Sequence, residues 1–150
     1  MTTPVYALTL SAAANSIRTG ELTSEAYTRA LLDRIAATDA NVLAWAYLDP
    51  DGALAAARQA DAERAAGAPI GPLAGIGIAV KDIVATVDQP TQLGSPIYAG
   101  ARPAYDADCV ARLRRAGGFV LGKGGAHGKS TAAKRRQAKV ELQKEIKQTD

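Results

Sequence analysis

The stretch from Pro72 to Gly94 reads PLAGIGIAVKDIVATVDQPTQLG, and the fold we expect is built around it. Its run IGIAVK, residues 76–81, predicts a short strand because apolar and small residues alternate there. The alternation predicts one face with Ile76, Ile78 and Val80 and another with Gly77, Ala79 and Lys81. The second face is small up to its lysine, and α/β proteins bind ligands at the carboxyl ends of strands. Lys81 is therefore the first candidate for chemistry, although a lysine that ends a strand is more commonly a solvated surface residue.

Three helices are predicted before this strand. The first covers residues 12–18, with Ser11 as N-cap and Gly20 at its end. The second begins at Thr23 or Ser24, and its apolar stripe consists of Tyr27, Leu31 and Ile35. The third has Asp49 as N-cap and Pro50 at its first position, and it runs to Gly67.

The remaining segments complete an α/β pattern. The run VLAWAYL, residues 42–48, predicts a buried strand with Trp45 in the core. Thr86–Tyr105 is rich in Pro and Gly and predicts an ordered surface loop, which either shapes the mouth of a site or only covers the sheet edge. A helix follows from Asp106 or Asp108 through Arg115, and residues 119–121 form another strand. Alternating helices and strands predict a mostly parallel or mixed sheet flanked by helices.

Length and composition exclude several classes of protein. With 150 residues and 47% hydrophobic content, the chain is expected to form one soluble domain, and no apolar run approaches the roughly 20 residues that cross a bilayer. A cytoplasmic location without membrane attachment is the default expectation. Cys109 is the one cysteine and His127 the one histidine, so neither a disulfide nor a zinc site is expected, and no cofactor is predicted.

Charge divides the chain near Lys123. Residues 1–128 hold 11 Lys and Arg against 12 Asp and Glu, whereas residues 129–150 hold 7 against 3. We therefore predict a domain over residues 1–123 and an unrelated Lys/Gln-rich tail over residues 124–150. The tail is expected to be helical or disordered, and a helix there would have an apolar stripe at Ala138, Leu142 and Ile146. The tail argues against nucleic-acid binding, because it contains no aromatic residue for base stacking. Its glycine-rich start, GKGGAHGKS, lacks the spacing of a phosphate-binding loop.

Three motifs in order, LAGIGIAVKDIV, PTQLGSPIYAG and DADCVARLRRAGGFVLGK, resemble the amino-terminal part of the amidase signature family. The resemblance extends from about Leu8 to Lys123. It implies that Lys81 is the lysine of a Ser-cis-Ser-Lys triad that hydrolyses carboxamide C–N bonds, with small carboxamides as substrates. In that role the lysine must accept a proton, so the site has to favour the neutral amine.

The resemblance stops where the family's catalytic serines would follow. After Lys123 the chain continues as GGAHGKSTAAKRRQ, and neither serine of the triad has a counterpart there; Ser95 lies upstream and lacks a nucleophile motif. This predicts a chain truncated before the serines and inactive alone, with unpaired strand edges that favour self-association. The alternative is a non-catalytic α/β fragment or interaction module with a basic tail. A free-standing amidase and a glutamine-using amidotransferase component both remain open, and the GSPIYAG loop slightly favours the free-standing type.

Overall fold

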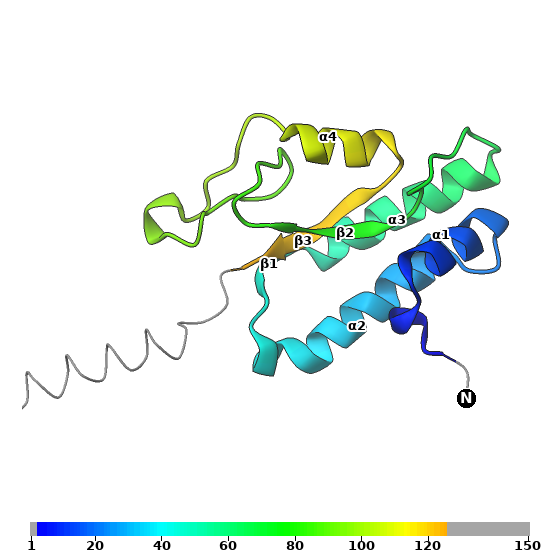
Figure 1. The fold of residues 1–150 in the computed structure, drawn as a ribbon, viewed down its shortest axis with the longest axis horizontal. Helices are drawn as coiled ribbons and strands as arrows, with labels where there is room; N and C mark the ends of the chain where they lie inside the picture. Colours follow the sequence, from blue (N-terminus) through cyan, green and yellow to red (C-terminus); the bar gives the residue numbers. More distant parts are fainter. Residues whose placement is uncertain (1–2, 126–150) are drawn as a thin grey trace, which may run out of the picture.

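The computed structural model describes residues 3–125, which form a small mixed sheet with helices on both faces (Figure 1). In chain order the elements are η1 (Val5–Ala7), α1 (Leu10–Thr19), α2 (Ser24–Val42), β1 (Trp45–Leu48), α3 (Pro50–Ala65), β2 (Gly77–Lys81), η2 (Pro96–Tyr98), α4 (Asp108–Arg115) and β3 (Phe119–Gly124). This arrangement confirms the α/β fold class. The predicted tail over residues 124–150 lies almost entirely outside the described residues, and so do His127 and the helix expected there.

The strand order in the sheet is β1-β3-β2, so the central strand is the last of the three in the described part of the chain. β2 runs parallel to β3, whereas β1 runs antiparallel to it. Residues 119–123 of β3 are buried, while the two outer strands are only partly covered. The carboxyl ends of β2 and β3 therefore meet at one edge of the sheet.

Local capping interactions set the helix ends. Gly20 ends α1 with φ of 80°, and the Asp49 carboxylate accepts the Gly52 N–H at 3.0 Å to cap α3, as the sequence predicted. Thr23 caps α2 through its hydroxyl. Ser11 was the wrong cap for α1, because the Thr9 hydroxyl accepts the Ala12 N–H and the helix begins at Leu10.

The prediction of a buried strand over residues 42–48 was wrong at its start and in its burial. α2 continues through Val42, and Leu43 ends it in the left-handed region with φ of 55°. The Asp39 carboxylate accepts the Ala44 N–H at 2.7 Å, which turns the chain into β1 only at Trp45. Trp45 packs against the core as expected, although β1 as a whole is an edge strand and is only partly buried.

The core lies on both faces of the sheet. On one face, α2 and α3 cover β3, with Leu32, Ala57, Phe119 and Leu121 in contact. On the other face, Val80 and Val120 pack against Val110 of α4. Figure 1 shows the same division, with α4 on one side of the sheet and α2 and α3 on the other.

The expected alternation along β2 does not hold. Ile76 precedes the strand and packs with α1 and α2, whereas Val80 packs beneath α4. The pairing of β2 with β3 shifts register between Ile78 and Ala79, which breaks the strict two-residue period. Gly77 is not open to a ligand, since a Cβ there would lie 3.0 Å from the ring of Phe119.

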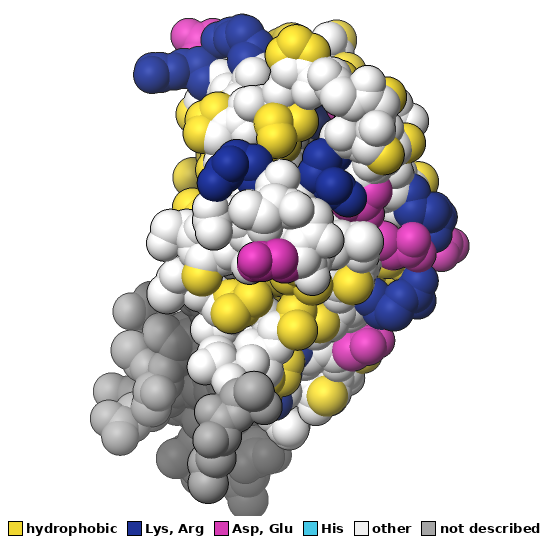
Figure 2. Space-filling model, turned by 90° about the vertical axis from the view of Figure 1, so that its right-hand side faces the viewer, with side chains coloured by type: hydrophobic (Ala, Val, Ile, Leu, Met, Phe, Trp, Pro, Cys, Tyr) yellow, Lys and Arg dark blue, Asp and Glu magenta, His cyan; other side chains and the backbone are white. Residues whose placement is uncertain are grey.

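The surface of the described part carries mixed charge. On the face in Figure 2, basic and acidic side chains lie next to one another, and hydrophobic side chains form small groups. One mixed cluster consists of Glu25 with Arg29 at 2.9 Å and Arg58 at 3.1 Å. Within residues 3–125, every helix is too short or too polar to cross a membrane.

Candidate functional site

Lys81 is the last residue of β2, at the edge where the two parallel strands end. Its side chain is exposed, and within residues 3–125 its Nζ donates one hydrogen bond, to the carbonyl of Gly125. The backbone N–H of the next residue, Asp82, donates to the Gly124 carbonyl at 2.9 Å, so the pairing with β3 continues past the strand. The candidate amine therefore lies where the sequence pattern predicted it, at a strand's carboxyl end, but it is not packed beneath other described residues.

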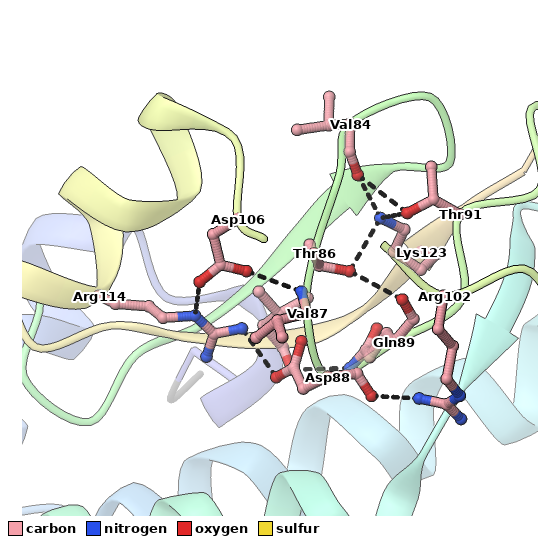
Figure 3. A network of polar contacts seen from close by, with 11 residues as sticks. Val84, Thr86, Val87, Asp88, Gln89, Thr91, Arg102, Asp106, Arg114 and Lys123 are labelled. Carbon is pink, nitrogen blue, oxygen red and sulfur yellow. Dashed lines mark hydrogen bonds and ion pairs between the residues drawn. The ribbon is translucent and has the colours of Figure 1, made fainter. Parts of the chain in front are cut away.

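A second lysine was missed as a candidate. Lys123 on β3 has no exposed surface, and its Nζ donates to three oxygens (Figure 3). These acceptors are the Val84 carbonyl, the Thr86 hydroxyl at 3.2 Å and the Thr91 hydroxyl at 3.1 Å. An ammonium has three N–H donors, so this arrangement satisfies all of them.

Burial lowers the pKa of the Lys123 ammonium below its ordinary value, because the charged form loses its hydration. Three carboxylates act in the opposite direction, those of Asp82, Asp88 and Asp106. Lys123 thus differs chemically from Lys81, since it is enclosed and fully hydrogen-bonded. Its geometry suits a structural cation that binds the loop after β2, and leaves no donor free for a substrate.

The far end of the same loop is held by an arginine on α4. Arg114 forms ion pairs with Asp88 at 2.7 Å and Asp106 at 2.9 Å (Figure 3). Asp106 also accepts the Val87 N–H at 2.9 Å, so its carboxylate is engaged with the loop, and neither predicted aspartate caps α4 through its side chain. Asp108 is instead the first residue of that helix, and the preceding Ala107 makes no side-chain cap.

The loop between β2 and α4 is ordered, as predicted, and its polar side chains hold its own backbone. The Thr86 hydroxyl donates to the Gln89 carbonyl at 3.1 Å, and the Gln89 amide donates to the Val120 carbonyl at 3.1 Å. Ser95 accepts the Ile97 N–H and so caps η2. The tip beyond it is open to solvent, and 86% of the Ile97 surface is exposed.

A cavity lies apart from both lysines. Its volume is about 410 Å³, and it is found between α1 and the turn before β2, lined by Ser11, Ala14, Asn15, Arg18, Gly71, Pro72 and Ala74. Lys81 is not among these residues. Among residues 3–125, no group of three His, Cys, Asp or Glu side chains is placed to hold a metal ion.

Comparison with known proteins identifies the family. Residues 26–128 match the sequence profile of the family described as Amidase. The chain belongs to this amidase family. Lys81 and the loop that follows it fall within the matched range, and the resemblance expected from the three motifs is confirmed.

The amidase-family relatives are much longer than this chain. It is 49% identical over 121 residues to a glutamyl-tRNA(Gln) amidotransferase subunit of Salinispora arenicola, covering 81% of this chain and 25% of the relative. It also resembles the native peptide amidase from Stenotrophomonas maltophilia, with 40% identity and a TM-score of 0.74 over 81% of this chain and 25% of the other. An amidase family protein from Bacillus anthracis gives 31% identity and a TM-score of 0.71, over 80% and 24%. The chain thus spans about a quarter of the length of these proteins.

Proposed function

We propose that this chain carries the general-base portion of an amidase site, with Lys81 as the base. The observation that supports the proposal is the position of Lys81, exposed at the common carboxyl edge of β2 and β3 in an amidase-family chain. The reaction is hydrolysis of a carboxamide C–N bond. A serine hydroxyl attacks the carbonyl carbon, and a second serine relays its proton to the neutral amine of Lys81. The proton returns to the leaving nitrogen as the C–N bond breaks, and water then hydrolyses the acyl-serine.

The proposal includes an incomplete site. In residues 3–125 the Nζ of Lys81 contacts a backbone carbonyl and no serine hydroxyl, and the hydroxyl of Ser95 is used to cap η2. After Lys123 the sequence GGAHGKSTAA does not resemble the family's serine-bearing continuation. We therefore propose that the chain supplies the lysine without the two serines and is inactive by itself. We also propose that it is located in the cytoplasm.

A chimera tests the role of Lys81. Residues 1–125 replace the corresponding quarter of the Stenotrophomonas maltophilia peptide amidase, and hydrolysis of that enzyme's own amide substrate is measured. We expect an active chimera that loses a factor of about 10² to 10⁴ in rate on Lys81→Ala, the usual contribution of a general base. Arg18→Ala is the matched control, because that cation is exposed on α1 and lies outside the proposed site. If the chimera is active and Lys81→Ala leaves its rate of amide hydrolysis unchanged, the assignment of Lys81 as the base is refuted.

The 150-residue chain alone tests the other half of the proposal. No carboxamide hydrolysis above background is expected from the wild type. If the wild-type chain hydrolysed a carboxamide and Lys81→Ala abolished this activity, the role of Lys81 would stand, but the proposed absence of a nucleophile would be refuted.

A further inference from the structure

Asp82 is a buried carboxylate that the amidase mechanism above does not use. Only 2% of its surface is exposed. Its Oδ1 accepts the N–H of Gln92 at 2.9 Å, and its Oδ2 accepts the N–H of Gly94 at 3.3 Å. Its own carbonyl accepts the N–H of Leu93 at 3.1 Å. Three consecutive N–H groups of the loop are thus directed at one residue.

The loop backbone at this point is in an unfavourable conformation. Leu93 has φ of 56°, in the left-handed region where a Cβ is poorly tolerated, and Gly94 follows with φ of 65°. The Leu93 side chain is 47% exposed, so burial of its apolar surface is at best a partial compensation. The hydrogen bonds to Asp82 hold the backbone in this conformation, together with the bond from the Ser95 N–H to the Gln92 carbonyl at 2.9 Å.

The strained segment is hydrogen-bonded to the residue that follows the candidate base. Asp82 immediately follows Lys81, and these two residues contact Gly124 and Gly125 at the end of β3 through the Asp82 N–H and the Lys81 Nζ. The first half of the same loop is bound by Lys123. The buried cation therefore holds oxygens of Val84, Thr86 and Thr91, and the buried carboxylate of Asp82 holds the N–H groups of Gln92 and Gly94.

We propose that Asp82 is a positioning residue of the candidate site, which fixes the backbone of residues 92–94 against the end of β2 that carries Lys81. A fixed backbone at Asp82 gives the adjacent Lys81 a defined position, from which its amine can be oriented toward a carboxamide substrate. The inference rests on the proposed function for the role of Lys81, but its test uses no turnover. Failure of one can therefore be distinguished from failure of the other.

The chain contains a matched control for Asp82. The carboxylate of Asp61 likewise accepts two backbone N–H groups, those of Ser24 at 2.8 Å and Glu25 at 3.0 Å. Asp82→Asn and Asp61→Asn each remove one charge that binds two amides. In the ¹⁵N-labelled 150-residue chain, Asp82→Asn is expected to accelerate amide hydrogen exchange at Gln92 and Gly94 about tenfold to hundredfold. Asp61→Asn should leave these two amides unchanged.

A second readout separates positioning from structural support. The side-chain Cε and Nζ NMR signals of Lys81, assigned with Lys81→Arg, should shift in Asp82→Asn and stay in place in Asp61→Asn. Asp82→Glu keeps the charge but displaces the carboxylate by one methylene, and it should also shift them. The proposal would be overturned if the Lys81 signals were unchanged in Asp82→Glu. It would also be overturned if Asp82→Asn raised amide hydrogen exchange uniformly over the sheet.

The wild-type protein provides a test that needs no substitution to fold. A carboxylate that accepts the Gln92 N–H transmits a through-hydrogen-bond coupling between the Gln92 amide nitrogen and the Asp82 Cγ. Detection of this coupling together with slow exchange at Gln92 supports the clamp. Fast exchange at both Gln92 and Gly94 in the wild type would refute it.

Discussion

Replacement of Lys123 by methionine tests whether a buried cation stabilises this fold. Methionine keeps most of the volume of the lysine stem and removes three hydrogen bonds from a charged donor, each of which contributes about 1.5–3 kcal/mol. Part of the loss is offset, because the Thr86 hydroxyl still donates to Gln89, the Thr91 hydroxyl still donates to Val84, and the desolvation cost of the ammonium disappears. We expect a net destabilisation of about 2–4 kcal/mol.

Urea unfolding of the 150-residue chain at neutral pH, followed by circular dichroism, measures this difference. Thr86→Val is the companion variant; it removes one acceptor of Lys123 and the donor to the Gln89 carbonyl, and we expect it to cost about 1–2 kcal/mol. The double variant should show a coupling of about 0.5–3 kcal/mol, because the two groups contact each other. A Lys123→Met variant within about 0.5 kcal/mol of the wild type, or more stable, would refute the reasoning and show that desolvation of the cation outweighs its hydrogen bonds.

Other predictions concern pH, a turn, a cap and association. Burial lowers the pKa of Lys123 in the folded protein, so between that pKa and the ordinary value near 10.4 the unfolded chain binds more protons than the folded chain. The stability of the wild type relative to Lys123→Met should therefore increase as the pH rises through this range. Paired urea titrations at several pH values measure the difference. Gly117→Ala should destabilise by about 1–3 kcal/mol in the same assay, because Gly117 has φ of 89° and its Cβ would lie 2.9 Å from Ala74. Thr23→Ala should cost about 1 kcal/mol through the lost cap of α2, and an unchanged midpoint would contradict this. Within residues 3–125, β1 and β2 are edge strands, which favours self-association, and a concentration-independent monomer mass by light scattering would count against it.

Features fixed by neighbouring residues were predictable from the sequence. Gly20 and the Asp49–Pro50 pair mark helix ends through contacts within four residues, and both were confirmed. The position of Lys81 at a strand end also follows from a local pattern. Whether Lys81 is a catalytic base stays a prediction, because no contact within residues 3–125 tests that role.

Features fixed by distant residues were not predictable. Lys123 lies 37 residues from Thr86 and 32 from Thr91, and nothing in the run FVLGK distinguishes an enclosed lysine from one that reaches solvent. The start of β1 depended on a left-handed Leu43, a conformation that residue type does not signal. The register shift opposite Ala79 likewise arises from pairing between two strands, so the alternation read from one of them was wrong.

The position of β3 has a consequence for how the chain is made. The two outer strands, β1 and β2, both pair with β3 and not with each other, yet β3 follows them in the chain. During synthesis neither strand pair of the described sheet can form until Phe119–Gly124 has left the ribosome, whereas the residues of α1, α2 and α3 have all been synthesised by then. Until then the nascent chain exposes two strand segments that lack their partner in this sheet. Chaperone binding to ribosome-bound chains should fall abruptly at the length that exposes Gly124, because one six-residue segment pairs both other strands of the sheet described in residues 3–125.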